Sequence, residues 1–442
     1  MSRLLFCSFL LCLGAQSNVL AAQLTAGPMA GPAALRSVLI WVQADAAATA
    51  RIEYQPASAA EAKPGKVARK LAAGEDFSAH LELAPLEPGT EYTYRVFLDD
   101  QQVGSGKVRT PPLWQWRSDP PALRVLLGSC AYINDPAYDR PGRPYGGGYE
   151  IFASMAAKRP DLTLWLGDNV YFREVDYDGP WGMSYRYRHG RALPELQALL
   201  RTGQHAAIWD DHDYGPNDAN AAFVFKAESL KLFRRYWANP SYGLPETPGI
   251  FTVVKAGDAE FFLLDGRWYR DSDRLKTETA RQMFGAAQMR WLKNALLQST
   301  AKFKVVASGS QVLNDHTRFE GWLNFPEERA EFLNWLAAQG MRGVFFLSGD
   351  RHFTELLKLE RGKRYPLYEL TCSPLSSNAY ASVDESGNTQ LVAGTLVRER
   401  NFCALDFRGP KDQREVVMRS FDVKGELLWE RVITEAELGY TP

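Results

Sequence analysis

The sequence predicts two domains, a small all-β sandwich followed by a larger α/β domain with a buried sheet. Residues 24–112 contain short strand-like segments without a convincing helical pattern, whereas beyond residue 122 strand-like and helical segments alternate. Between them, the stretch RTPPLWQWRSDPPALRV contains two Pro-Pro pairs around a Trp-rich segment, as is typical of a linker. At 442 residues the chain is long enough for two or three domains.

The first domain is predicted from five strand-like segments, SVLIWVQAD, ARIEYQP, SAHLEL, EYTYRVFLDD and GKVRTPP, which Gly-, Pro- and Ala-rich turns separate. The stretch LEPGTEYTYRVFLDD resembles the signature of fibronectin type III-like domains, in which a turn leads into a Tyr-bearing strand. We therefore predict a fibronectin type III-like β-sandwich over residues 23–112 and a linker over residues 113–122. This resemblance concerns the fold and implies nothing about chemistry.

The second domain covers residues 123–442. Its strand-like segments are LRVLLGS, LTLWLGD, AAIWDD, FFLLDG, KVVASGS and GVFFLSGD. Its helical segments are YEIFASMAAK, LPELQALLRT, KAESLKLFRRYW, AQMRWLKNALLQ and EERAEFLNWLAAQ. Residues 132–149 and 172–192 are expected to be loops. The Gly-rich PYGGGY in the first of them lacks the Lys-Ser/Thr of a phosphate-binding P-loop, so we interpret it as a flexible lip.

Residues 1–22 have the pattern of a Sec-type signal peptide, with one arginine, a short apolar run and small residues before the expected cleavage near Ala21 or Ala22. This predicts a secreted or periplasmic protein. The apolar run is too short for a stable membrane anchor. The net charge of -1 provides no global attraction for nucleic acid, so no specific nucleic-acid site is expected.

Three of the five cysteines, Cys130, Cys372 and Cys403, remain after removal of this leader. In an oxidising compartment two of three cysteines can pair, while the third serves another purpose. The sequence leaves open whether Cys372 and Cys403 form a disulfide.

Unusual polar residues follow four of the apolar strands of the second domain. They are Cys130, Asp168 with Asn169 and Tyr171, Asp210 to Asp213, and Asp350 with His352. Ligands of open α/β sheets bind outside the carboxyl ends of the strands, so these side chains are expected to converge. Carboxylates gathered without cations have raised pKa values and destabilise the fold, and bound metal ions remove that conflict. The mixture of thiolate, phenolate, imidazole and carboxylate favours iron beside a harder ion.

The motifs GSC, GDNVY, WDDHD, LLDGRWYRD, QMRWL and SGDRH occur in this order between about residues 120 and 380. This series resembles the alkaline phosphatase D (PhoD-like) family of the calcineurin-like metallophosphatase superfamily. The resemblance implies an α/β metallophosphatase-type sandwich, with two central mixed sheets flanked by helices. It also implies an exported metal-dependent phosphoesterase, an alkaline phosphatase or phosphodiesterase. The chain departs from the wider superfamily by having Ser-Cys in place of Asp-x-His at the first strand.

The resemblance also implies the ligands of two metal ions. Cys130, Asp168, Tyr171 and His352 would hold Fe³⁺, with the tyrosine used as in purple acid phosphatases. Asp168 would bridge to a second ion, which Asp211 and Asp350 complete. Ca²⁺ is expected there, with Mn²⁺, Mg²⁺ and Zn²⁺ as alternatives. Asn217 is a further candidate ligand to that ion, although the alignment around it is loose.

Three residues are predicted to act on the phosphate ester itself, and a fourth is predicted to orient one of them. By analogy with the superfamily, His212 is the general acid for the leaving alkoxide or a donor to the phosphate, and Asp213 orients it. Arg267 and Arg143 are predicted to bind the phosphate, since a guanidinium can grip two of its oxygens. Asp210 is expected to cap or support the end of its strand.

The substrate class remains open at this stage. Phosphate monoesters and diesters, including phospholipids, are all compatible with the motifs, so a phospholipase D-like phosphodiesterase is an alternative. A non-catalytic binding protein built on the β-sandwich is a second alternative, but it would be expected to lack a ligand. The sequence does not determine the physiological ester, the pH optimum or the oligomeric state.

Overall fold

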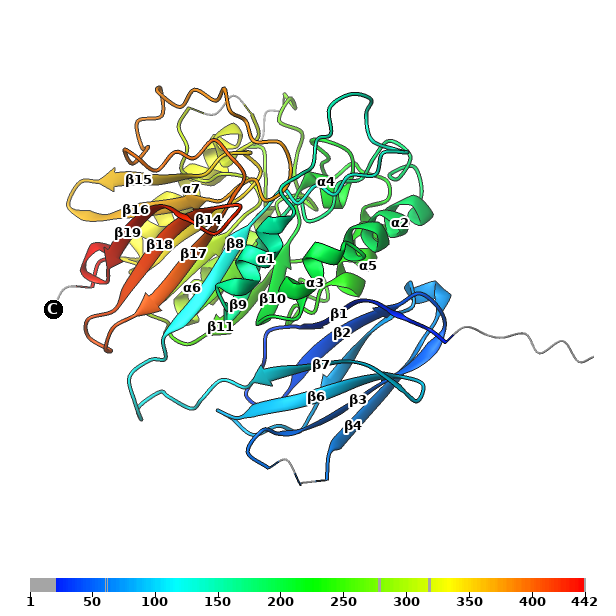
Figure 1. Cartoon of the computed structure of the whole chain (residues 1–442). Helices are drawn as coiled ribbons and strands as arrows, with labels where there is room; N and C mark the ends of the chain where they lie inside the picture. The colour runs from blue at the N-terminus through cyan, green and yellow to red at the C-terminus, as the bar shows by residue number, and fades with distance from the viewer. Residues whose placement is uncertain (1–20, 60, 62, 277–279, 317–318, 441–442) are drawn as a thin grey trace, which may run out of the picture.

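A computed structural model describes residues 21–440 apart from residues 60, 62, 277–279 and 317–318. The predicted signal peptide therefore lies outside the described residues except for its last two positions. No helix within the described part of the chain is long and apolar enough to cross a membrane. Figure 1 shows the β-sandwich, in blue, below the larger domain.

The N-terminal sandwich contains the predicted strands and two further ones, β1 and β4. One layer consists of β1, β2 and β5, and the other has the order β4-β3-β6-β7. Their inward side chains, such as Ile40, Ile52 and Val96, form a hydrophobic core of their own. The strands are β1 (Leu24–Ala30), β2 (Val38–Ala44), β3 (Ala48–Pro56), β4 (Gly65–Leu71), β5 (Ser78–Leu83), β6 (Glu91–Leu98) and β7 (Gln101–Arg109). The closer likeness to fibronectin type III domains stays a prediction.

The two domains share a sheet. Strand β1 pairs in parallel with β10 (Gln204–Ile208) through Ala30 and Gln204, which gives a nine-stranded sheet in the order β19-β18-β17-β8-β9-β10-β1-β2-β5. An uncovered edge at β10 would expose unpaired backbone groups, and β1 covers it. The sandwich thus extends the sheet of the larger domain.

The larger domain has two mixed sheets, as the resemblance implies. In the first, β8 (Leu123–Gly128), β9 (Leu162–Leu166) and β10 are parallel, and β17 (Asn401–Arg408), β18 (Glu415–Asp422) and β19 (Leu427–Thr434) continue it antiparallel. The second has the order β11-β12-β13-β14-β16-β15. Its strands are β11 (Thr252–Ala256), β12 (Ala259–Leu263), β13 (Phe303–Ala307), β14 (Val344–Ser348), β15 (Glu355–Arg361) and β16 (Arg364–Thr371).

The helices cover the outer faces of the two sheets (Figure 1). Those at predicted positions are α1 (Glu150–Ala157), α3 (Gln197–Leu200), α5 (Lys226–Tyr236), α6 (Ala286–Gln298) and α7 (Pro326–Ala338). Short helices are α4 (Asp211–Tyr214), η1 (Ala73–Glu75), η2 (Pro194–Leu196), η3 (Trp322–Asn324) and η4 (Ala436–Leu438). Leu292 of α6 and Phe332 of α7 pack in one cluster with Phe346 of β14. Between the sheets, the rings of Phe303 and Phe407 lie 4.9 Å apart.

One loop prediction is wrong, because residues 172–192 contain the helix α2 (Pro180–Arg191). Its proline at the start supplies a preset helical φ. It buries Met183 and Tyr187, but also Arg186, so the inward face is not uniformly apolar. That mixed face lacks the apolar period from which a helix is recognised in a sequence.

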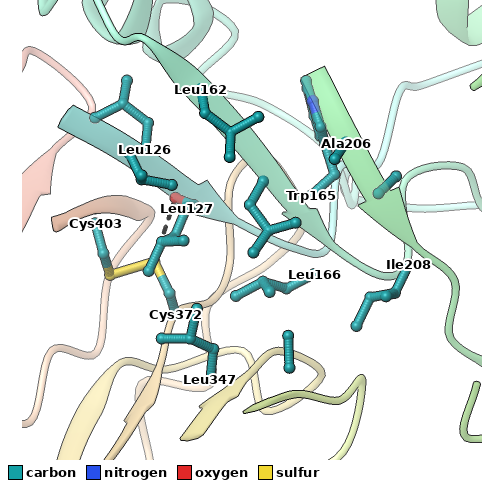
Figure 2. Close-up of a cluster of buried hydrophobic side chains, with 14 of the residues drawn as sticks. Leu126, Leu127, Leu162, Trp165, Leu166, Ala206, Ile208, Leu347, Cys372 and Cys403 are labelled. Carbon is teal, nitrogen blue, oxygen red and sulfur yellow. Dashed lines mark hydrogen bonds between the residues drawn. A yellow bond between two sulfur atoms is a disulfide. The ribbon is translucent and has the colours of Figure 1, made fainter. Parts of the chain in front are cut away.

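A disulfide joins Cys372, which follows β16, to Cys403 of β17, with their Cα atoms 6.1 Å apart. Because β16 and β17 belong to different sheets, the bond links the two layers within the core (Figure 2). The question that the sequence left open is thereby answered. Among the described cysteines Cys130 is free, and it is buried.

Candidate metal centre

The polar residues that follow β8, β9 and β14 adopt an unusual backbone conformation. Cys130, Asp168, Asp350 and His352 have φ values of 59°, 53°, 66° and 56°. Residues other than glycine seldom occupy this left-handed region, and such strain persists where the surrounding structure enforces it, often at functional sites. The turns after three strands thus hold these four side chains in a demanding geometry.

The predicted iron ligands lie together. The ligand atoms of Cys130, Asp168 and His352 are within 4.8 Å of one another. The phenol oxygen of Tyr171 is 3.1 Å from Asp168 Oδ2 and 3.2 Å from His352 Nε2. Four side chains from three separate turns therefore surround one point.

Carboxylates continue the site beyond Asp168. Further groups with ligand atoms within 4.8 Å are Asp168 with Asp211 and His212, Asp210 with Asp211 and Asp350, and Asp211 with Asp218 and Glu320. Asp168 belongs to two groups, as a bridging ligand would, and Asp211 belongs to three. The predicted second-site residues Asp211 and Asp350 are thus brought together.

Sequence reasoning did not propose Asp210, Asp218 or Glu320 as ligands. Asn217 and its neighbour Asp218 are both exposed, and the backbone N–H of Asp218 donates to Asp211 Oδ2 over 2.8 Å. The role of Asn217 as a metal ligand stays a prediction. Glu320 has no local signal, since it follows no strand and reaches the site only through tertiary packing.

The electrostatics of the site call for cations. Burial, followed by the charge of Asp211, raises the pKa of Asp168 well above its usual range. Burial and the charge of Asp210 raise the pKa of Asp350 to about 7. Burial raises the pKa of the Cys130 thiol to about 12, and the charge of Asp350 adds to it. The pKa values rise because several acidic groups are buried close together without enough positive charge beside them. Bound cations would lower these pKa values again.

Two buried oxygens, Asp210 Oδ2 and Asp211 Oδ1, have no hydrogen-bond partner among the described residues. A buried acceptor without a donor is costly, and a metal ion is one partner that would satisfy it. The donor set therefore fits metal ions: sulfur, imidazole and phenol lie on the Cys130 side, and carboxylate oxygens, with the imidazole of His212 beside them, lie beyond it.

Arg267 is fully buried beneath the carboxylates. Its Nε donates to Asp210 Oδ1 and its Nη2 to Glu320 Oε2, both over 2.5 Å, and its Nη1 donates to Ala219 O over 3.2 Å. Every nitrogen of the guanidinium is thus engaged inside the protein. The prediction that Arg267 binds the phosphate is at odds with this geometry, because no edge of the guanidinium is free. It holds Asp210 and Glu320 in place instead.

Arg143, the other predicted phosphate ligand, is exposed in the loop between β8 and α1. Its role in binding the phosphate stays a prediction. Burial lowers the pKa of Arg400, and the charge of Arg143 lowers it further, so Arg143 lies towards Arg400.

His212 lies over the site. Its ring stacks on that of Tyr171 with the centroids 4.2 Å apart, and its Nε2 is 3.9 Å from Asp211 Oδ2. Burial lowers the pKa of His212, while the charge of Asp211 opposes that shift. The imidazole is thus held beside the carboxylates without being buried among them, since 23% of the side chain is exposed.

Asp213 does not orient His212, contrary to the prediction. Its Oδ1 accepts from the backbone N–H of Asp210 over 2.6 Å, and its Oδ2 accepts from the Asn169 side-chain amide over 2.6 Å. It therefore ties the turn after β9 to the turn after β10. The carboxylate close to the imidazole is that of Asp211. In the one-turn helix α4 the side chains of residues 211 and 213 point in different directions. Asp210 supports the end of its strand through Arg267, in line with the expectation for it.

Two further residues contact the predicted iron ligands. The phenol oxygen of Tyr145, in the lip PYGGGY, is 3.2 Å from His352 Nδ1. The hydroxyl of Ser373 donates to Cys130 Sγ over 3.1 Å and accepts from the backbone N–H of His352 over 2.9 Å. The Gly-rich stretch PYGGGY had drawn attention to the loop that contains Tyr145. Ser373 had none, since it lies 243 residues from Cys130.

Two mixed sheets with flanking helices, and a set of buried Cys130, Asp168 and Tyr171 with the half-buried His352 after their strands, are the architecture of a metallophosphatase. A family model for PhoD-like phosphatases matches residues 126–414, which is more than half of the chain. The protein therefore belongs to the PhoD-like phosphatase family. A second model, for a domain of unknown function (DUF7800), matches residues 21–113, which is the β-sandwich.

Individual relatives agree with this assignment. The chain is 27% identical to alkaline phosphatase D of Bacillus subtilis (strain 168) over 326 residues, covering 62% of this chain and 53% of the relative. It thus spans about half the length of that curated protein. The solved structure of PhoD superimposes with a TM-score of 0.75 at 20% identity, covering 94% of this chain and 90% of the other. A purple acid phosphatase from yellow lupin (Lupinus luteus) seeds gives 0.65 at 10% identity, covering 94% and 74%. Both structures share the fold.

Proposed function

We propose that the protein is an exported metal-dependent phosphoesterase, which hydrolyses phosphate mono- or diesters at a dinuclear or multinuclear metal site. Membership of the PhoD-like phosphatase family supports this proposal. The observation that carries it is the convergence of Cys130, Asp168, Tyr171 and His352 with the acidic groups around Asp211. An adhesion or binding protein would have no need for such a costly set of buried acids.

The metals that suit these donors are Fe³⁺ and Ca²⁺. Cys130, Asp168, Tyr171 and His352 offer the sulfur, phenolate and imidazole donors that iron accepts. Asp211 and Asp350, with Asp168 shared, offer oxygens for Ca²⁺, with Mn²⁺, Mg²⁺ or Zn²⁺ as alternatives. Asp218 and Glu320 extend this oxygen-rich part of the site. Two bound cations would activate a water molecule and neutralise charge on the phosphoryl oxygens.

The residues of the chain have distinct tasks in this mechanism. His212 is placed to protonate the leaving oxygen, and the nearby Asp211 stabilises its charged form. Tyr171, stacked against the imidazole, limits its rotation. Arg267 and Asp213 keep the carboxylates and the strand-end turns in position, so that the site need not reorganise during the reaction.

The substitution Asp168→Asn tests the function, and Asp161→Asn at the opposite end of the same strand is its matched control. Asp161 Oδ2 accepts from the backbone N–H of Arg124 over 2.8 Å, away from the site. We expect Asp168→Asn to lose iron and to hydrolyse p-nitrophenyl phosphate more than about 100-fold more slowly, because a shared ligand is worth several kcal/mol to the transition state. Asp161→Asn should retain both metal and activity.

The same assay can contradict the proposal. The wild-type protein, supplied with iron and calcium, would have to show no hydrolysis of aryl phosphate monoesters, diesters or a phospholipid between neutral and alkaline pH, and elemental analysis would have to find no bound metal. The proposed export is tested separately, by the mass and N-terminal sequence of the mature protein. A mature chain beginning at its first methionine would exclude cleavage after residue 21 or 22.

A further inference from the structure

Arg351 is a buried cation that forms no ion pair with any of the described residues. The residue is only 6% exposed. Its Nε has no hydrogen-bond partner, and no carboxylate of the described residues lies within the 4.0 Å of an ion pair. Its guanidinium instead lies over the ring of Phe319, 4.7 Å from the centroid, and 5.3 Å from that of Phe353.

Other buried arginines in the described chain are compensated. Those with a carboxylate partner are Arg173, Arg186, Arg267, Arg270 and Arg414. Arg191 has no carboxylate, but it donates to the backbone oxygen of Tyr236 over 3.1 Å and stacks on Trp237 at 4.0 Å. Arg351 differs from all of them, since its guanidinium makes two ring contacts but no hydrogen bond or ion pair with the described residues. Burying a cation in this way is costly unless an anion joins it.

The position of Arg351 indicates where that anion comes from. In the chain it lies between Asp350 and His352, which belong to two of the ligand groups. The ring that it covers, Phe319, precedes Glu320, which belongs to a third group. Burial lowers the pKa of His352, and the charge of Arg351 lowers it further, so the guanidinium lies close to the metal centre.

The charge of Arg351 also acts on two carboxylates, Asp350 and Glu355, and opposes the rise that burial causes in their pKa values. Neither lies within ion-pair distance of Arg351: Asp350 belongs to a ligand group, and Glu355 Oε1 accepts from Gln311 Nε2 over 2.7 Å. Glu320 is paired with Arg267.

We propose that Arg351 is a substrate-binding residue whose guanidinium receives the anionic oxygens of the phosphate ester. This inference rests on the proposed function and transfers to Arg351 the task that the sequence suggested for Arg267. A planar guanidinium can take two phosphate oxygens at once, and stacking on Phe319 and Phe353 fixes its plane. Phe319 is 51% exposed and makes an edge contact with Tyr380, 40% exposed, at 5.9 Å, which provides an aromatic rim for the organic part of the ester.

The test is the substitution Arg351→Gln in the metal-loaded protein. We expect the Kd for inorganic phosphate, measured by calorimetry, and the KM for p-nitrophenyl phosphate to rise about 10- to 100-fold, the range of a charged hydrogen bond. Metal content should be unchanged. Arg351→Lys keeps the positive charge but loses the planar guanidinium that can bind two oxygens at once. Its phosphate affinity should therefore lie between those of the wild type and Arg351→Gln. Arg361→Gln is the matched control, since Arg361 stacks on Tyr365 at 4.5 Å on β15, and it should alter neither constant.

Two results would overturn the inference. Unchanged phosphate affinity in Arg351→Gln at full metal content would show that the residue does not receive the anion. Loss of metal from both the Gln and the Lys variants would show that it supports the ligands instead. Phosphate binding is measured without turnover, so an inactive wild-type protein would count against the proposed function and leave this test intact.

Discussion

At the scale of single residues, the candidate ligands are themselves held in place. His352 is contacted at both ring nitrogens, with Tyr171 at Nε2 and Tyr145 at Nδ1. The Ser373 hydroxyl accepts from the backbone of His352, so its single hydrogen is free to point at Cys130 Sγ. A sulfur that accepts a hydrogen bond suits a thiolate bound to metal. Contacts of this kind orient metal ligands and tune the metal they hold.

Tyr145→Phe should therefore weaken iron binding. The change removes the phenol oxygen that lies 3.2 Å from His352 Nδ1 while keeping the ring. Loss of such a supporting contact typically costs about 10- to 100-fold in metal affinity. The measurement is the rate and extent of iron loss to a chelator. Tyr138→Phe, in the same loop but with its ring 5.9 Å from that of Tyr185, is the control. Equal iron loss from both variants would contradict the role of Tyr145.

At the scale of elements, the site depends on turns that bring backbones close together after the strands. Gly309 follows β13, and a Cβ atom there would lie 2.4 Å from the carboxyl carbon of Asp210. The backbone N–H of Gly349, after β14, donates to Gly309 O over 2.8 Å. The absence of a side chain at Gly309 thus allows the end of β13 to lie directly against the carboxyl group of Asp210, which pairs with Arg267.

Gly309→Ala should disturb that pair. The added methyl group must displace the Asp210 carboxylate or the backbone, and overpacking of this kind costs about 1–3 kcal/mol. We expect a lower free energy of unfolding in urea and reduced metal loading. Gly74→Ala, where nothing lies within 4 Å of the new Cβ, is the matched control. Stability and metal content equal to those of the control would show that the close approach has no consequence.

At the scale of the whole molecule, one sheet runs through both domains and one disulfide joins the two sheets. The core beneath the site contains His205 on β10, whose Nδ1 accepts from Trp165 Nε1 over 3.2 Å and whose Nε2 donates to Leu199 O over 3.1 Å. This arrangement requires the neutral ring. Burial, with a contribution from the charge of Arg191, lowers the pKa of His205 from 6.5 to about 3.

The protein should accordingly lose stability in mild acid. Because the pKa of His205 is lower in the folded than in the unfolded state, protons favour the unfolded chain as the pH falls from about 6.5 towards about 3. At about pH 5 the loss is about 2 kcal/mol. Urea unfolding near neutrality and near pH 5 measures it, and His205→Gln should reduce the difference by about that amount. His316→Gln is the control. An equal pH dependence in the wild type and His205→Gln would exclude His205 as the cause.

Particular residues show how far the sequence could predict the site. Cys130, Asp168, Asp350 and His352 were identifiable because each follows an apolar strand, and the ends of parallel strands meet at one edge of a sheet. The roles predicted for Asp213 and Arg267 differ from the contacts that they make. Both are charged and follow strands near the candidate ligands, as catalytic or substrate-binding residues would. Which neighbour a carboxylate or guanidinium faces depends on side-chain directions that the order of residues does not encode.

By itself the sequence determined the division into a β-rich and an α/β part, the strands that carry the ligands, and the chemistry that those ligands favour. These follow from periodicity and from residue type, which are local properties. Only the tertiary structure decided that the two parts share a sheet, that Cys372 pairs with Cys403, and that Glu320 and Ser373 join the site. It also decided that Arg351, and not Arg267, lacks an ion-pair partner among the described residues. Each of these depends on contacts between residues far apart in the chain, and such contacts arise when the sheets pack.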